Sequence, residues 1–205
     1  MSLRIDDIVR HGRAFKLGVE MPLDDIRPTI RALFEMLGEA KVDYLLVGGV
    51  ALLSYVAGRN TEDIDLIVRP EEATRLPWQA TVADVDFGRA SFGGVRVDLL
   101  LTSNDLFRHV LEAERTVVRF GELDVPCATR EGLLLLKLFA LPSLYRQNNL
   151  ARAALYETDI LMLHQDADVD DARLLERIRP FVSRSDLQEL EKILDEQRSR
   201  RRFGK

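Results

Sequence analysis

The alternation of hydrophobic and polar positions predicts a mixed domain in the first two thirds of the chain. Residues 23–41 carry apolar side chains at helical spacing, and "DYLLVG" at 43–48 is an apolar run typical of a buried strand. The segment 49–58 has the length of a short helix that ends at Gly58, and "DIDLIV" at 63–68 is predicted as a second strand. A strand, a helix and a strand therefore follow one another.

A third strand and a further helix are predicted beyond this unit. In "GGVRVDLLL" at 93–101, apolar and polar positions alternate, which is typical of a strand with two different faces. Asp98 lies on the more polar face of that strand. The segment 103–114 has a helical pattern, and its N-cap is either Ser103 or Asn104 because both side chains can accept backbone N–H groups.

The last β structure that the pattern predicts is a hairpin over 115–128, which turns at Gly121 and Glu122. From residue 129 onward the spacing is almost entirely helical. We expect four helices, at 129–141, 151–165, 170–182 and 184–197, with a connector at 142–149 between the first and the second. The predicted fold class is α+β, or α/β-like, over 1–128, followed by a helical C-terminal region over 129–205.

Composition and charge narrow the classes of protein. The 205 residues are 46% hydrophobic and 31% charged, as in a globular protein that buries a core. The single cysteine, Cys127, cannot form an internal disulfide, and the N-terminus has acids where a signal peptide needs an apolar run. We therefore expect a cytoplasmic protein with no membrane association. The net charge of −5 argues against a dedicated nucleic-acid binder, and the basic segment 198–205 is interpreted as a solvated end.

Two acids within the second predicted strand, Asp63 and Asp65, are the first candidates for chemistry. Alternate strand residues share a face, so their Cα atoms should lie about 6.6 Å apart on one side of the sheet. If the strand that carries Asp98 is a neighbour, three carboxylates converge and require a compensating cation. Mg²⁺ is the natural choice, because it prefers carboxylate oxygens and keeps positions for water and phosphate. The alternative is that these acids mark a solvated strand edge or a turn.

The glycine pair Gly48–Gly49 lies between the first strand and the helix that follows. Glycines at such a junction expose backbone N–H groups and allow a phosphate to approach closely. The alternative is a tight turn that requires positive φ. The dinucleotide pattern G-x-G-x-x-G and the P-loop pattern are both absent, so neither a Rossmann cofactor nor a P-loop ATPase is supported.

"LLVGGVALLSYVAGRNTEDIDLIV" followed by "VRVDLLL" resembles the nucleotidyltransferase fold of the polymerase β superfamily. That signature is a glycine pair, a helix, D-x-[DE] and a third acid on a later strand. The resemblance implies a small mixed sheet flanked by helices. It also implies that Gly48 and Gly49 hold the triphosphate of an NTP, that Asp63 and Asp65 bind two Mg²⁺ ions, for which Mn²⁺ could substitute, and that Asp98 binds one ion and helps activate the acceptor.

Two further segments extend the resemblance. "GRNTEDIDL" resembles the R-x-T-x-D-x-D run of small bacterial members, which places Arg59 and Thr61 at the nucleotide. "TREGLLLLKLFAL" followed by "ALYETDILML" resembles the helical region of AbiEii-type proteins. This similarity implies that Lys137 contacts nucleotide phosphate and that Asp159 orients Lys137 or the base. The alternatives are a snorkelling lysine and a solvated helix face.

The resemblance implies a magnesium-dependent transferase that moves an NMP from an NTP to an acceptor and releases pyrophosphate. Four acceptors stay open: a protein side chain, a tRNA 3′ end, an aminoglycoside-like small molecule and another nucleotide. Some relatives act in toxin–antitoxin or phage-defence systems, so a cognate antitoxin or partner protein belongs to the same expectation. Two rival classes are a non-catalytic binding module that retains the fold, and a glycosyltransferase, whose D-x-D motif also binds a metal-held nucleotide sugar.

Overall fold

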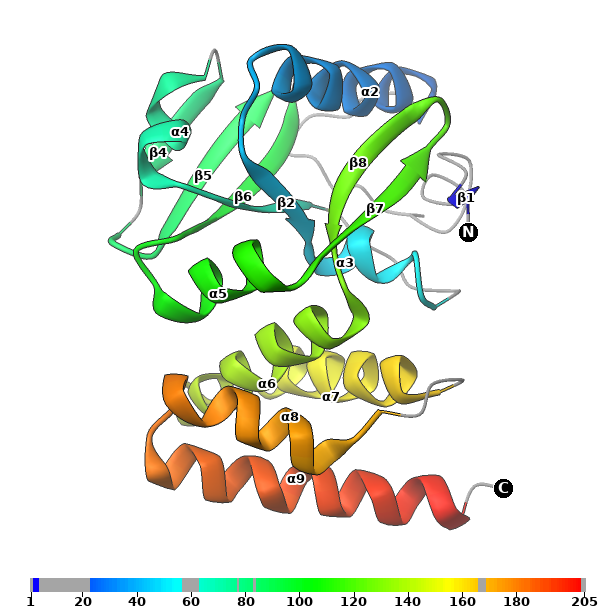
Figure 1. Cartoon of the computed structure of the whole chain (residues 1–205), viewed down its shortest axis with the longest axis vertical. Coiled ribbons are helices and arrows are strands. Elements are labelled where there is room, and N and C mark those ends of the chain that lie inside the picture. Colours follow the sequence, from blue (N-terminus) through cyan, green and yellow to red (C-terminus); the bar gives the residue numbers. More distant parts are fainter. Residues whose placement is uncertain are drawn as a thin grey trace. The chain divides into compact units, whose positions relative to one another are not determined.

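The protein is described by a computed structural model that covers residues 2–3, 23–56, 63–76, 78–82, 84–165 and 169–203. The chain divides into two compact units, Met1–Thr129 and Arg130–Lys205. The first unit is built on a β-sheet and the second consists of helices (Figure 1).

A single mixed sheet of eight described strands forms the first unit, in the order β1-β7-β8-β2-β3-β6-β5-β4. β3 pairs antiparallel with β2 and parallel with β6, and β5 pairs antiparallel with both β6 and β4. The strands are β1 (Ser2–Leu3), β2 (Tyr44–Val47), β3 (Ile64–Val68), β4 (Gln79–Val82), β5 (Phe87–Phe92), β6 (Val95–Leu101), β7 (Arg115–Phe120) and β8 (Leu123–Ala128).

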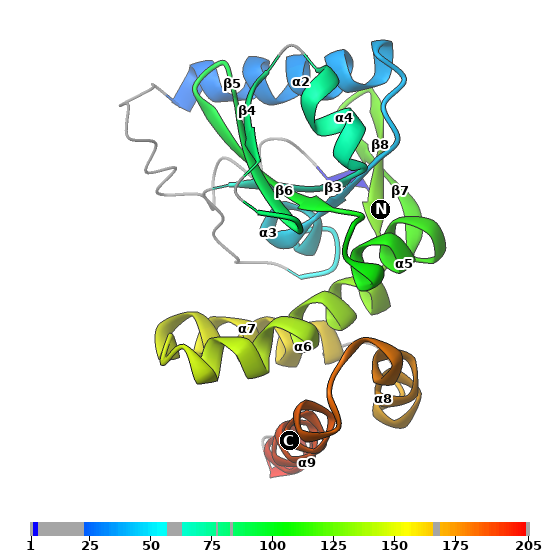
Figure 2. The ribbon, with the colours of Figure 1, turned by 90° about the vertical axis from the view of Figure 1, so that its left-hand side faces the viewer.

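Helices cover both faces of this sheet, with α2 on one face and α3 and α5 on the other (Figures 1 and 2). On the α2 face, the Phe34 ring stacks on Tyr44 of β2 with ring centroids 6.2 Å apart, and the aliphatic side chains of β3 and β6 are buried beside them. The opposite face carries the acids of β3 and β6. The helices are α2 (Leu23–Glu39), α3 (Gly48–Leu52), α4 (Pro70–Arg75) and α5 (Asp105–Ala113).

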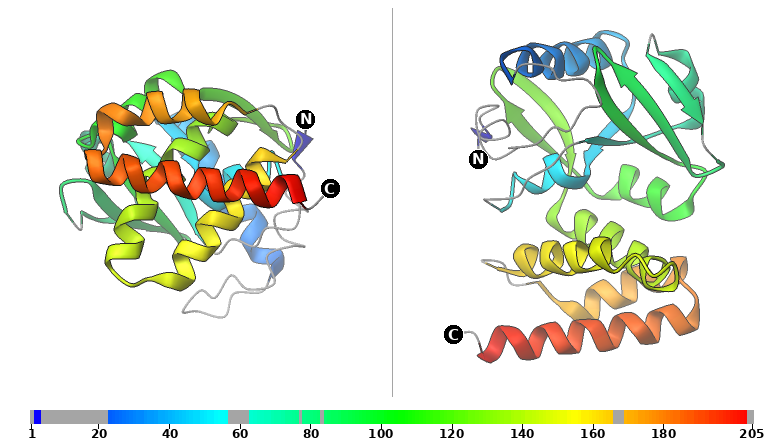
Figure 3. Two further views of the ribbon diagram at one scale, coloured as in Figure 1. Left: turned by 90° about the horizontal axis from the view of Figure 1, so that it is seen from below. Right: turned by 180° about the vertical axis from the view of Figure 1, so that it is seen from behind.

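In the second unit, α6 packs against each of the three helices that follow it (Figure 3). A buried polar contact joins three of these helices: His164 Nε2 lies 2.8 Å from Asp171 Oδ1, and Arg198 donates to Asp171 Oδ2 at 3.1 Å. The helices are α6 (Arg130–Arg146), α7 (Leu150–His164), α8 (Asp171–Ile178) and α9 (Arg184–Phe203), with a 3₁₀ turn at Arg179–Phe181. No described helix of either unit is both long and apolar enough to cross a membrane.

The structure confirms the predicted strands at 43–48, 63–68 and 93–101 and the hairpin over 115–128. It also settles the cap of α5, because the Asn104 side chain accepts the N–H groups of Leu106 and Phe107. The prediction missed the strands β4 and β5, which pair beside β6.

Three predicted extents are wrong. The last helix, expected to end at 197, continues to Phe203, and Arg198, in the segment expected to be a solvated end, donates to the buried Asp171. The helix expected at 49–58 ends at Leu52, because the N–H groups of Ser54 and Tyr55 bond to carbonyls three residues back and tighten the chain into turns. The Tyr55 hydroxyl then donates to the carbonyl of Ala128 at 2.9 Å. The connector expected at 142–149 is also mostly helical, because α6 continues through the buried Pro142 to Arg146.

Replacing the N-cap of α5 should measurably destabilise the protein. Asn104→Ala should lower the free energy of unfolding by about 1 kcal/mol, because two N–H groups at the helix start lose their acceptor. Urea denaturation of the full chain measures this change. Asn104→Ser keeps a capping oxygen and should recover most of the loss, whereas an alanine variant as stable as the parent would contradict the cap assignment.

Candidate functional site

Strand pairing brings the three predicted acids to one place on the sheet. In the parallel pair of β3 with β6, Asp65 lies directly opposite Asp98. Asp63 immediately precedes β3, and all three residues are partly buried. The carboxylates therefore come from two adjacent central strands, on the face opposite α2.

The glycine pair forms the start of α3 beside these acids. Val47, the last residue of β2, lies opposite Asp65, and Gly48 follows with a φ of +66°. A Cβ atom on Gly48 would lie 1.8 Å from Asp65 Oδ2, which no side chain could tolerate. The positive φ supports the interpretation of Gly48 as a turn residue, and the close approach of Asp65 gives a second reason for glycine here. Phosphate binding by the glycine pair stays a prediction.

Two arginines that the sequence analysis did not select, Arg96 and Arg89, contact the same acids. Arg96 donates from Nε to Asp98 Oδ1 at 3.0 Å, and its Nε lies 3.5 Å from Asp63 Oδ1. Arg89, opposite Asp98 in the β5–β6 pair, donates from Nε to Asp98 Oδ1 at 3.1 Å. Arg96 could have been found from the alternation of β6, but Arg89 depends on a strand that the pattern did not predict.

These arginines determine the ionisation of the site. Burial raises the pKa of Asp98, but hydrogen bonds and charges from Arg96 and Arg89 outweigh it, so this pKa lies below its usual value. Hydrogen bonding to Asp98 raises the pKa of Arg96, and the charges of Asp98, Asp63 and Asp65 add to that effect. Asp98 is therefore held as a carboxylate in the structure.

The donor chemistry of the site fits a hard divalent cation. Three carboxylates on one face supply the oxygen ligands that Mg²⁺ prefers, and the Arg96 guanidinium is a protein-borne cation that already contacts two of them. In the part of the chain that the structure describes, no three His, Cys, Asp or Glu side chains are already gathered as a ligand set. Arg96 instead lies between two of these acids, Asp63 and Asp98, and contributes positive charge to both.

The two acid–base residues predicted in the helical unit contact each other. Lys137 Nζ lies 2.7 Å from Asp159 Oδ2 and 4.1 Å from the centre of the Tyr156 ring. The Lys137 side chain is 7% exposed and that of Asp159 is 0% exposed. Lys137 is therefore not a snorkelling lysine, and Asp159 is not a solvated acid, because both side chains are buried in one ion pair.

Two further candidates from the sequence cannot be placed relative to these acids. Arg59 and Thr61 lie outside the described residues.

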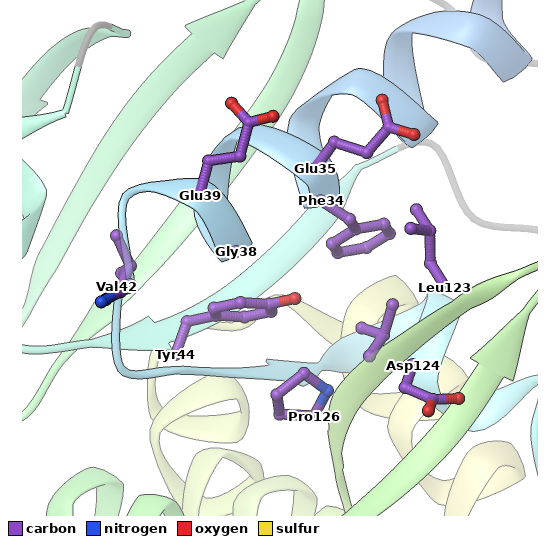
Figure 4. Close-up of a pocket in the computed structure, with 11 residues that line it drawn as sticks. Phe34, Glu35, Gly38, Glu39, Val42, Tyr44, Leu123, Asp124 and Pro126 are labelled. Carbon is purple, nitrogen blue, oxygen red and sulfur yellow. The ribbon is translucent and has the colours of Figure 1, made fainter.

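A hollow of about 420 Å³ lies between α2 and β8, with the rings of Phe34 and Tyr44 at its base (Figure 4). Tyr44 projects to the α2 face of the sheet, so this hollow is separate from Asp65 and Asp98. Cys127 is buried, and burial raises the pKa of its thiol to about 12.

The chain matches no family model and no curated protein. Among solved structures it is similar to an antigenic nucleotidyltransferase-like protein from Paracoccidioides brasiliensis, with 17% identity, a TM-score of 0.56, and coverage of 86% of this chain and 89% of that chain. The chain has the nucleotidyltransferase fold. Two further matches have lower TM-scores. A candidate nucleotidyltransferase from Thermotoga maritima has 14% identity and a TM-score of 0.48, over 66% of this chain and 96% of that chain. ANT(2″)-Ia in complex with adenylyl-2″-tobramycin has 13% identity and a TM-score of 0.38, over 83% of this chain and 95% of that chain.

Removing Arg96 should raise the pKa of Asp98. The folded-state pKa lies below the ordinary value of 3.8, so the stabilisation by ionised Asp98 is complete above that value and is lost as pH falls through the folded-state pKa. In Arg96→Met this loss should begin at higher pH. Carbon NMR of the Asp98 carboxyl group in EDTA measures the shift. Arg119→Met, on an exposed position of β7, is the control, and an unchanged Asp98 pKa in Arg96→Met would refute the assignment.

Breaking the buried pair of the helical unit should destabilise the protein strongly. Lys137→Met leaves Asp159 without its cation and should lower the free energy of unfolding by about 3–5 kcal/mol. The double variant with Asp159→Leu removes both charges and should recover much of that loss. Chemical denaturation compares them, with the exposed Lys192→Met as the control. A single variant as stable as the control would show that the pair has no structural role.

Proposed function

We propose that the protein is a magnesium-dependent nucleotidyltransferase that transfers an NMP from an NTP to an acceptor hydroxyl and releases pyrophosphate. One observation carries the proposal: the β3–β6 register sets Asp65 opposite Asp98, and the Asp65 carboxylate lies directly against Gly48, so the acids and the glycine pair meet at one place. A solvated strand edge does not account for this arrangement, because both strands lie in the interior of the sheet.

The roles follow from position. Asp63 and Asp65 would hold the metal ions on the side of Gly48 and Gly49, where backbone can approach the triphosphate. Bound Mg²⁺ would neutralise the triphosphate and stabilise the charge that develops on the leaving pyrophosphate. Since Arg96 contacts Asp63 and Asp98, its guanidinium must leave these carboxylates when they ligate a metal ion.

The transfer itself is a substitution at phosphorus. An electron pair of the acceptor hydroxyl oxygen forms the new bond to the α-phosphorus. The bond between the α-phosphorus and the α–β bridging oxygen breaks, and pyrophosphate leaves with the electron pair of that broken bond. Asp98 lies opposite Asp65 and would accept a hydrogen bond from the acceptor hydroxyl, which would orient that hydroxyl. Because the arginines keep the pKa of Asp98 low, we assign the hydroxyl proton to solvent rather than to a permanent base.

The residues of the helical unit enter as proposals from the resemblance to AbiEii-type proteins. The buried ion pair supports the part of that expectation in which Asp159 orients Lys137. Phosphate contact by Lys137, and nucleotide contacts by Arg59 and Thr61, stay predictions. The same holds for the choice of NTP and for a role in a toxin–antitoxin or phage-defence pair with a cognate partner.

A second candidate is a non-catalytic nucleotide- or partner-binding module. The observation in its favour is the double pairing of Asp98 with Arg96 and Arg89, since a protein that no longer needs a metal ion could hold its acids together in this way. The two candidates differ in turnover. Incubating the full chain with each α-phosphate-labelled NTP and Mg²⁺, and assaying pyrophosphate and transferred label, separates them.

The variant Asp65→Asn should abolish transfer while the fold survives. Losing one metal ligand should cost about a thousandfold in the rate of pyrophosphate release. Asp124→Asn, an exposed aspartate on β8 of the same unit, is the matched control and should keep the parent rate. Circular dichroism of both variants checks folding. An Asp65→Asn protein that transfers NMP at the parent rate would overturn the assignment.

A further inference from the structure

The sheet surface beside Asp98 carries side chains that the proposed transfer does not yet use. In the β5–β6 pair, Phe87 lies opposite Leu100, Arg89 opposite Asp98 and Ser91 opposite Arg96. The exposed positions of β5 alternate with buried ones, so Phe87, Arg89 and Ser91 share the face of the candidate site. We call Phe87, Arg89 and Arg96 the acceptor surface.

The cations of this surface retain hydrogen-bonding capacity. Arg89 donates to Asp98 only through Nε, and its side chain is 62% exposed. Among the described residues, its two terminal nitrogens have no partner. A guanidinium group offers five N–H donors in a planar fork that matches two phosphate oxygens. Arg89 can therefore hold Asp98 and bind an external anion at the same time.

An aromatic ring lies next to these cations. Phe87 is 45% exposed, although most large apolar side chains of this unit are buried. Its ring meets Phe107 of α5 edge to face, with centroids 5.5 Å apart and planes at 71°, so the ring has a fixed orientation. An exposed, held ring beside arginines is the combination that stacks a base while its phosphates are bound.

Two acids lie just before β5. Asp84 Oδ1 accepts the N–H groups of Asp86 and Phe87, and Asp86 accepts from the amide of Asn104, the N-cap of α5, at 3.2 Å. These bonds orient both carboxylates but leave their negative charges in place. The β5 residues that lie opposite Leu100, Asp98 and Arg96 are Phe87, Arg89 and Ser91, none of which is acidic.

We propose that the acceptor is a phosphate-bearing nucleotide hydroxyl, seated with its base on Phe87 and its phosphate on Arg89 and Arg96. The proposal rests on the proposed transfer at Asp65 and Asp98, and it selects among the acceptors that the sequence left open. A polycationic aminoglycoside would place its ammonium groups against Arg89 and Arg96, so we expect it to compete poorly for this surface. A mononucleotide and the 3′ end of a polynucleotide share the required chemistry.

Direct binding tests the acceptor surface without chemistry. A short 5′-fluorescein-labelled single-stranded RNA is titrated with the full chain at a fixed Mg²⁺ concentration and without NTP, and its anisotropy is measured at several concentrations of monovalent salt. Arg89→Gln should weaken binding about tenfold and reduce the slope of log K against log salt by about 0.7, as expected for one lost phosphate contact. Phe87→Ala should weaken binding about tenfold with an unchanged slope.

Controls and competitors decide the outcome. Arg119→Gln, on the exposed face of β7, should bind as the parent does. Displacement of the RNA by AMP at a similar concentration identifies a mononucleotide acceptor, and resistance to AMP identifies a polynucleotide end; either result supports the proposal. Equal binding by Arg89→Gln and Arg119→Gln, or displacement by kanamycin better than by AMP, would overturn it. Pyrophosphate release, measured separately, would show whether the transfer proposal fails instead.

Discussion

The parallel pairing of β3 with β6 is the constraint on which the rest of the first unit depends. Its register places Leu66 and Leu99 together on the face beneath α2, and Asp65 and Asp98 together on the other face. Because strand side chains alternate, a slip of one residue would turn an aspartate into the core and a leucine toward the site. The burial of the leucines and the position of the carboxylates are therefore two consequences of one register.

Charge neutralisation is the second constraint. Carboxylates that converge on a partly buried face repel one another unless a cation is near. Arg96 meets this requirement from the same strand as Asp98, so no ligand has to be present for the sheet to form. The helical unit solves a similar problem by pairing Lys137 with Asp159 in its core. In both units a charge that is costly to bury is accompanied by its partner from the protein itself.

The sequence predicted the strands whose apolar pattern is strong. It missed strands whose own apolar pattern is weak and which are recognised only from their pairing with a neighbouring strand. β2, β3 and β6 have apolar runs or clear alternation, and their acids and glycines were placed correctly relative to them. β5 has the sequence "FGRASF", in which the apolar positions are few and Phe87 is exposed, so its pairing with β6 was not visible. Arg89 could not be assigned without that register. The connector expected at 142–149 was wrong for a related reason. A proline disfavours the interior of a helix, and the burial of Pro142 within α6 cannot be seen in the sequence.

The two sides of the candidate site differ in charge, and this difference connects metal binding with substrate binding. Beside Asp65 lies Gly48, which adds no charge, whereas Asp98 is held by two arginines. Three carboxylates against two guanidinium groups leave the cluster net negative, which disfavours an incoming triphosphate. On the proposed function, a divalent cation on the carboxylates would reverse that sign and compete with Arg96 for Asp63 and Asp98, so that the charge of Arg96 would become available to an anion on the acceptor side. Under that proposal, the residue that neutralises the metal-free site is also the one that would bind phosphate in the metal-bound site.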